Sequence, residues 1–271
     1  MEHLGGTRQD RRGILRPDEG AAHFRLTRPL PAEDLRDVVD RHWIVRWDLR
    51  GRPPFRQAIL PHPCVHIVFE PGRSAVWGIA DGQTSHHLQG LGEVVGVKFR
   101  PGAFSPYSAL PALELTGKVV SFAEALGPGG EELAAAGEAC ATALERIALV
   151  EAFLRERRPP PDRGVQTVVA VAEAMRDGPI DLRVADVATQ HGLSMRSLQR
   201  LFRAHVGVSP KWVLQRYRMH EAAERMAAGE ETDPAALALD LGYFDQAHFG
   251  NDFRRYVGVP PAAYAAMCAA A

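Results

Sequence analysis

The sequence predicts an α+β fold in two parts: a small antiparallel β-barrel-like domain with flanking helices, and a C-terminal all-α domain. Three observations predict it. Before Ser121, several short runs alternate apolar and polar residues, as antiparallel strands do. Three prolines at 159–161 interrupt the chain, because proline cannot continue a helix. After Gly164 every apolar pattern has helical spacing, and one pattern occurs twice.

These breaks divide the 271 residues into four segments. We expect a flexible arm over 1–22, a first globular domain over 23–154, a Pro-rich linker over 155–164 and the helical domain over 165–271.

The composition is that of a globular protein with its own core: 46% of the residues are hydrophobic and 24% are charged. The N-terminus lacks the apolar stretch of a signal peptide, and no run of ~18 apolar residues predicts a membrane span. The three cysteines, Cys64, Cys140 and Cys268, are scattered and odd in number, which favours a reducing compartment over a disulfide framework. We therefore expect a cytoplasmic protein.

Three alternating runs predict strands in the first domain, over 43–48, 64–69 and 95–100. Proline and glycine turns separate them, which favours an antiparallel sheet or a small barrel.

Helices are expected before and after these strands in the sequence. A short helix is predicted over Asp34–Arg41, because Leu35, Val38, Val39 and His42 have helical spacing. The Ala-rich segment 131–154 follows a Gly-Pro-Gly-Gly break and is expected to be helical.

Eight positions of the helical domain recur with an offset of 50 or 51 residues. The first copy consists of Ala188, Gly192, Leu193, Ser194, Leu198, Phe202, Gly207 and Pro210. The second consists of Ala238, Gly242, Tyr243, Asp245, Phe249, Phe253, Gly258 and Pro261. The offset grows because the second copy has one extra turn residue, Phe244.

Each recurring position has a mechanical reason. The first glycine of each copy permits the left-handed backbone that ends a helix, and Ser194 or Asp245 can cap the next one. The apolar pairs at i and i+4 then bury its inner face. This pattern predicts two helix-turn-helix units, joined by a long helix over Pro210–Gly229. If that helix sets their separation near one DNA turn, ~34 Å, both units can enter successive major grooves.

The charge distribution favours DNA contact by the first unit. The net charge of −1 does not by itself favour binding to a polyanion. Between Met195 and Arg218, however, there are six cations and no carboxylate: Arg196, Arg200, Arg203, Lys211, Arg216 and Arg218. Between Met219 and Asp252 there is one arginine against eight acidic residues, so the second unit is expected to bind more weakly.

The segment from Asp181 to Tyr264 resembles the DNA-binding domain of AraC/XylS-type transcription regulators, on the run DVATQHGLSMRSLQRLFRAHVGVSP and the run LGYFDQAHFGNDFRRYVGVPP. The pieces LPHPCVHIVFE and GVKFRPGAF resemble a cupin-like domain that precedes such modules and is taken as a sensor. The resemblance implies a regulator that binds double-stranded DNA, responds to an unknown small-molecule effector or protein partner, and can form a homodimer. It implies no enzyme activity and no cofactor.

The same resemblance, with helix geometry, indicates the DNA-contacting residues. They are Arg196, Ser197, Gln199, Arg200 and Arg203 in the first unit and Gln246, His248 and Asn251 in the second. Arginine can donate two hydrogen bonds to guanine, and glutamine can pair with adenine. Arg203, Arg216 and Arg218 are expected to contact phosphates or to be structural. Asn251 departs from the family, which commonly has arginine there. For His248 a structural role at the turn stays open.

A rival interpretation is a metal-dependent cupin-like enzyme or metal sensor fused to a DNA-binding module. His62, Cys64 and His66 alternate and would share one face of a strand, with Glu70 four residues beyond. These side chains are acceptable ligands for a transition metal. No second ligand cluster follows, so we expect no metal. Trp43, Trp47, Trp77, Phe99 and Phe104 are expected to form a core rather than line a pocket.

Two further alternatives have less support. A DNA-repair methyltransferase would need a cysteine in a zinc-binding arrangement, which the three scattered cysteines do not supply. A partner-binding adaptor that never touches DNA stays open. The sequence has no nucleophile elbow, P-loop or dinucleotide fingerprint.

Overall fold

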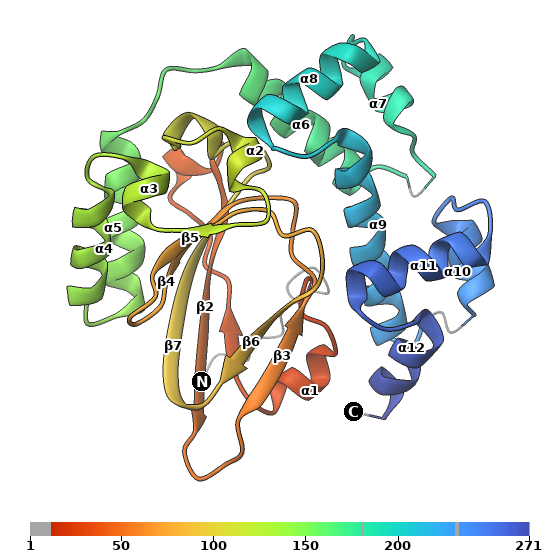
Figure 1. The fold of residues 1–271 in the computed structure, drawn as a ribbon, viewed down its shortest axis with the longest axis horizontal. Helices are drawn as coiled ribbons and strands as arrows, with labels where there is room; N and C mark the ends of the chain where they lie inside the picture. The colour runs from red at the N-terminus through yellow and green to blue at the C-terminus, as the bar shows by residue number, and fades with distance from the viewer. Residues whose placement is uncertain (1–11, 180, 231–232, 271) are drawn as a thin grey trace.

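The computed structural model describes residues 12–179, 181–230 and 233–270, and shows a sheet domain against which a helical domain packs (Figure 1). The predicted α+β class is confirmed. Within those ranges, no helix is both long and apolar enough to cross a membrane.

An antiparallel sheet of six strands, in the order β1-β2-β7-β4-β5-β8, forms the centre of the first domain. Its strands are β1 Arg25–Thr27, β2 Val39–Leu49, β4 His66–Phe69, β5 Ala75–Trp77, β7 Gly90–Phe99 and β8 Val119–Val120. A separate ribbon pairs β3 Phe55–Ile59 with β6 Thr84–Leu88. The three predicted strands are confirmed as β2, β4 and β7.

The two faces of the sheet have different partners. On β7, Val95, Val97 and Phe99 point into the main core with residues of the flanking helices. The alternate residues Val94 and Lys98 line a cavity on the other face. Period-two alternation therefore separates a packed core from a cavity.

Helices cover the core face (Figure 1). They are α2 Ala112–Leu115, α3 Phe122–Leu126, α4 Gly130–Ala139 and α5 Ala143–Glu156. The segment expected as one helix over 131–154 is split, because Thr142 caps α5 and Glu145 completes its capping box.

The short helix expected over Asp34–Arg41 is wrong. The chain forms a 3₁₀ turn at Glu33–Leu35 and enters β2 at Val39. Leu35 and Val39 still share the core.

Residues 12–22 pack against the protein instead of forming part of a flexible arm; residues 1–11 lie outside the described ranges. Ile14 pairs with Ile59, Leu15 is buried, and Pro17–Ala21 form helix α1.

Every regular element that the structure describes after residue 162 is a helix, as predicted. Helix α5 ends at Glu156 and α6 begins at Arg163, where Asp162 caps it. The first helix-turn-helix unit contains α6 Arg163–Asp177, α7 Val184–Gln190 and α8 Met195–His205. The long helix α9, Pro210–Ala227, leads to α10 Pro234–Asp240, α11 Gln246–Val257 and α12 Pro261–Ala269. The proposed boundary at 165 stays a prediction.

Candidate nucleic-acid interface

The first recognition helix, α8, has the local structure that the repeat predicts. Gly192 has a φ of 65° in the turn after α7, a conformation that glycine adopts without strain. Ser194 caps α8 by accepting a hydrogen bond from the Ser197 N–H. Leu198 and Phe202 are buried and fix the inner face of the helix.

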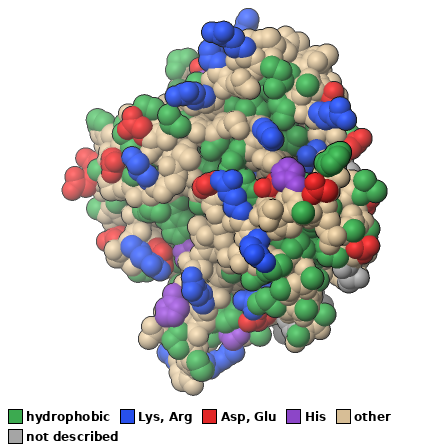
Figure 2. Space-filling model, turned by 45° about the vertical axis from the view of Figure 1, so that its right-hand side comes forward, with side chains coloured by type: hydrophobic (Ala, Val, Ile, Leu, Met, Phe, Trp, Pro, Cys, Tyr) green, Lys and Arg blue, Asp and Glu red, His purple; other side chains and the backbone are tan. Residues whose placement is uncertain are grey.

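The outer face of α8 carries exposed Arg196, Gln199, Arg200 and Arg203. Within the described residues these four side chains make no hydrogen bond or ion pair. Ser197 is only half-exposed, and its hydroxyl oxygen accepts a hydrogen bond from the Ser194 hydroxyl over 3.0 Å. Figure 2 shows cationic side chains at the top of the molecule, the height at which α8 lies in Figure 1. This face can offer several donors to a duplex at once.

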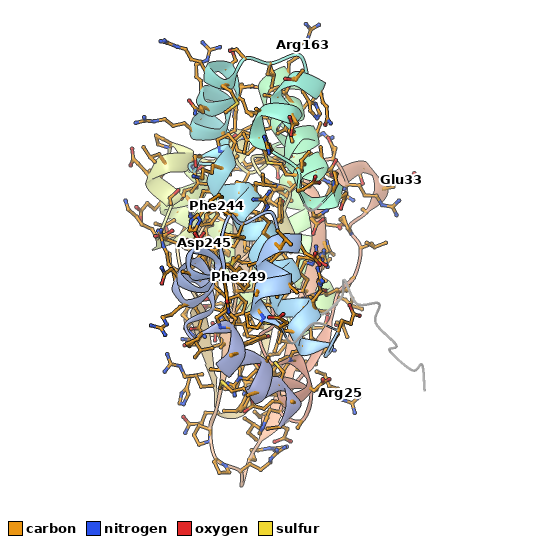
Figure 3. The ribbon with its side chains drawn as sticks, turned by 90° about the vertical axis from the view of Figure 1, so that its right-hand side faces the viewer. Arg25, Glu33, Arg163, Phe244, Asp245 and Phe249 are labelled. Carbon is orange, nitrogen blue, oxygen red and sulfur yellow. The ribbon has the colours of Figure 1, made fainter. Side chains whose placement is uncertain are left out.

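The second recognition helix, α11, repeats the architecture with different chemistry. Asp245 caps it by accepting from the His248 N–H over 2.7 Å, and Phe249 and Phe253 are buried. Gln246, His248 and Asn251 are exposed. Figure 3 shows Phe244 and Asp245 at the beginning of this helix, where Phe244 is 96% exposed.

His248 has neighbours within its own unit. Its ring lies edge-on to Tyr243, and its Nε2 is 3.7 Å from the Asp252 carboxylate. Asp252 also accepts from the Tyr243 hydroxyl. These contacts support the structural role that stayed open for His248, although its side chain is still 54% exposed.

Arg216 is not available to phosphates. It is completely buried, and its guanidinium donates to the carbonyl oxygens of Pro61, Ala80 and Asp81. The rings of Trp212 and Tyr256 lie with their centroids 4.4 and 4.6 Å from its guanidinium carbon. Of the two roles expected for Arg216, the structural one holds, and its partners belong to the sheet domain. Burial lowers the pKa of Arg216 to about 10.

Arg218 is also structural. Its guanidinium donates to the carbonyl oxygen of Leu182 over 2.8 Å, which ties α9 to the first unit.

Asp81, in the loop before β6, holds both α9 and α11. Its carboxylate accepts from the Trp212 indole N–H over 3.0 Å and from Arg255 over 3.0 Å. Trp212 and Arg255 keep the pKa of Asp81 below its usual value. The second unit thus gives up one of its few cations to the sheet domain.

The two glycines that end the recognition helices both lie against the sheet domain. Gly207 has a φ of 88°, and a Cβ there would overlap the Ala112 carbonyl and Thr116. Gly258 has a φ of 90°, and a Cβ there would overlap Gln83. His205 adds a 2.9 Å hydrogen bond to Ser105. The same position of each repeat is therefore docked on the first domain.

The sheet domain contains a cavity of 160 Å³ between its sheet and the β3–β6 ribbon. Trp43, Trp47 and Trp77 line it, so the expectation that they form a core was wrong for these three. Phe99 and Phe104 do lie in the core. A sequence signal existed: two glycines, Gly92 and Gly96, lie within β7 opposite Trp47 and Trp43.

His62, Cys64 and His66 line the same cavity but have other contacts. The Trp43 indole donates to His66 Nδ1, so His66 Nε2 carries the proton and faces Cys64 Sγ at 3.5 Å. Burial raises the pKa of Cys64 to about 12 and lowers that of His66 to about 3. His62 stacks on His220. Among the described residues, no three His, Cys, Asp or Glu side chains are grouped to hold a metal.

Two family models match the chain. One, described as a helix-turn-helix domain, matches residues 187–267, and the other, a domain of unknown function (DUF6597), matches residues 27–121.

Curated relatives are named as transcription regulators. The chain is 28% identical over 212 residues to the transcriptional activator NphR of a Rhodococcus species, covering 78% of this chain and 56% of that protein. It is 34% identical over 89 residues to a putative AraC-like transcription regulator of Streptomyces lividans, covering 33% of this chain and 29% of that protein. The chain thus spans about half or less of these relatives' lengths.

Among solved structures, ToxT of Vibrio cholerae aligns over 90% of this chain and 98% of its own, with 10% identity and a TM-score of 0.38. So approximate a superposition does not bear on function.

Proposed function

We propose that this chain, whose C-terminal domain resembles that of AraC/XylS-type regulators, is a sequence-specific DNA-binding transcription regulator. In this proposal it acts in the cytoplasm on double-stranded DNA, without enzyme activity, and its first domain senses an effector or partner.

One observation carries the DNA-binding proposal: a capped, firmly packed helix presents Arg196, Gln199, Arg200 and Arg203 with no protein partner in the described structure. Long donors without intramolecular partners suit base edges and phosphates. The N-terminal residues of a recognition helix are the ones that reach bases, which fits Arg196 and Gln199.

Selection of bound duplexes from a random library tests this proposal and identifies the site. On the selected duplex, Arg196→Ala combined with Arg200→Ala should abolish the specific gel shift, because two bidentate contacts are lost. The matched control is Arg25→Ala, an exposed arginine that lies at the end of the molecule away from Arg163 (Figure 3). Failure to enrich any sequence, or equal loss in the control, would refute the proposal.

The sensor role is supported by the position of the cavity. Gly78 and Ala80, which precede the Asp81 loop, line it, and Pro61 lines it as well. The carbonyl oxygens of Pro61 and Ala80 accept from Arg216 in α9. An occupant of the cavity would therefore press on the backbone that holds the DNA-binding domain, which gives a direct route from ligand to DNA affinity.

A further inference from the structure

Two indole rings form the floor of the cavity. Trp43 and Trp47 lie on β2, and their register partners on β7 are Gly96 and Gly92. A Cβ at either glycine would overlap the facing indole, so the rings lie across the neighbouring strand. Neither glycine has a positive φ, so the glycines provide space rather than an unusual backbone. The result is a flat aromatic surface, which favours a planar ring stacked on it.

The remaining walls set the size of the occupant. Trp77 stacks on His86, with ring centroids 4.7 Å apart, and adds a second aromatic surface. The cavity volume of 160 Å³ suits a single ring. In another protein, an apolar cavity of ~150 Å³ is known to accept benzene.

One end of the cavity is basic. Arg41 and Lys98 line it, and among the described lining residues there is no Asp or Glu. Asp40, just outside, accepts from Arg41 at 2.8 Å and from Lys98 at 3.0 Å, and Arg176 lies 3.8 Å away, so one carboxylate serves three cations. The Lys98 side chain is only 11% exposed. An excess of buried positive charge is unfavourable, and an anionic group in the cavity would offset it.

We propose that this cavity binds an aromatic carboxylate with one ring, which rests on the sensor role proposed above. The ring stacks on Trp43, which lies next to Arg41 and Lys98 in the β2–β7 register, and the carboxylate accepts hydrogen bonds from Lys98 and Arg41. Ring and charge are both required, because the floor and the basic end are separate features of the same cavity.

Calorimetry and tryptophan fluorescence on the full chain test the ligand class with four probes. Benzoate has both features, benzyl alcohol has only the ring, and cyclohexanecarboxylate and octanoate have only the charge. Benzoate should bind ~10–100-fold more tightly than benzyl alcohol, because charge-assisted hydrogen bonds are lost in the alcohol. It should also bind more tightly than the two non-aromatic acids. If any of the three binds as well as benzoate, or benzoate does not bind, the proposal is overturned.

Variants locate the binding. Lys98→Met should remove the preference for benzoate over benzyl alcohol, whereas Lys118→Met, an exposed lysine outside the cavity, should keep it. Trp43→Leu should remove the preference for benzoate over cyclohexanecarboxylate, which provides a second test if the lysine variant does not fold. Unchanged preferences in both variants would place the site elsewhere.

The gel shift on the selected duplex separates the two proposals. A chain that binds DNA but not benzoate refutes the ligand class alone. A chain that binds benzoate but no DNA refutes the regulator.

Discussion

At the residue scale, equivalent positions of the two helix-turn-helix units carry different side chains. Arg200 and Asn251 occupy the same repeat position, and both are exposed. A guanidinium reaches further than a carboxamide, carries charge and can fork onto guanine. The first unit is therefore expected to dominate affinity.

Single substitutions measure this asymmetry. Arg200→Ala should weaken specific binding by about 1–3 kcal/mol, and Asn251→Ala by much less. Asn251→Arg should tighten binding and steepen its salt dependence, while Arg203→Ala should lower the salt slope by about 1. A salt titration on the selected duplex checks all four. Equal losses for Arg200→Ala and Asn251→Ala would contradict the asymmetry.

Two glycines should respond to alanine with opposite signs. Gly96→Ala forces the Trp43 ring away and disturbs its hydrogen bond to His66, so it should destabilise the fold by about 1–3 kcal/mol, as overpacking does. Gly250 lies inside α11 with open space around it, so Gly250→Ala should stabilise by about 0.5–1 kcal/mol. Urea unfolding of both variants measures the difference. A neutral Gly96→Ala would mean that the indole floor is not fixed.

At the element scale, α9 is more than a spacer between two helix-turn-helix units. Its Trp212 and Arg216 bind the loop around Asp81, and the same carboxylate holds Arg255 at the end of α11. Removing the negative charge of Asp81 should release Arg255 and make it available for contact with DNA phosphates.

Asp81→Asn should therefore tighten binding to all sequences and steepen the salt dependence by up to about 0.9, the slope for one added phosphate contact. Asp48→Asn, which removes an exposed aspartate paired locally with Arg50, is the control and should change neither. Filter binding over a range of salt concentrations provides both numbers. Weaker binding by Asp81→Asn would show that the contact positions Arg255 for DNA instead.

Predictability from the sequence differed from element to element for physical reasons. The repeat could be predicted because each of its positions has a local structural role, such as capping a helix or forming a turn. Leu35 and Val39 were misread as helical because a 3₁₀ turn that leads directly into a strand buries both side chains in one core, as a helix with a spacing of four residues would. Arg216 could not be placed, because its partners are backbone carbonyls more than 130 residues away in the sequence.

The cavity could be predicted from the sequence only in part. Gly92 and Gly96 lie on one face of the same strand, and glycine inside a strand is a visible sign of close packing. That their partners are Trp47 and Trp43 depends on the β2–β7 register. In the sequence, Lys98 cannot be told apart from an exposed lysine in a strand. Only the fold brings it close to Asp40.

At the scale of the whole molecule, two stacked histidines join the domains. The rings of His62 and His220 lie 4.3 Å apart, and each Nε2 donates to a backbone carbonyl, of Arg12 and Pro61 respectively. Burial lowers the pKa of both, and the nearby charges of Lys98, Arg12, Arg28 and Arg216 lower it further. Both rings are therefore neutral in the folded protein.

Stability should consequently decrease in acid. Below about pH 6.5 the unfolded chain protonates these histidines and the folded chain does not, so each can remove up to about 1.4 kcal/mol per pH unit. The contribution is complete above that pH and is lost as the pH falls. Urea unfolding between about pH 5 and 7.5 should show a shallower dependence for His220→Gln than for the exposed control His87→Gln. Identical slopes would exclude the pair as the cause.

The docking of Gly207 and Gly258 on one domain also has a consequence for DNA curvature. When both recognition helices are held against another domain, the distance between them is fixed. The DNA must then bend so that its two major grooves meet the helices. Bending a site by 40–90° costs of order 1–6 kcal/mol and is cheapest at pyrimidine–purine steps. Duplexes with a TA step midway between the two contacted grooves should bind more tightly than duplexes with an A-tract there, although no side chain touches either. Affinities for such a matched pair, in wild type and in Asp81→Asn, would show how much sequence preference this protein derives from the stiffness of its operator.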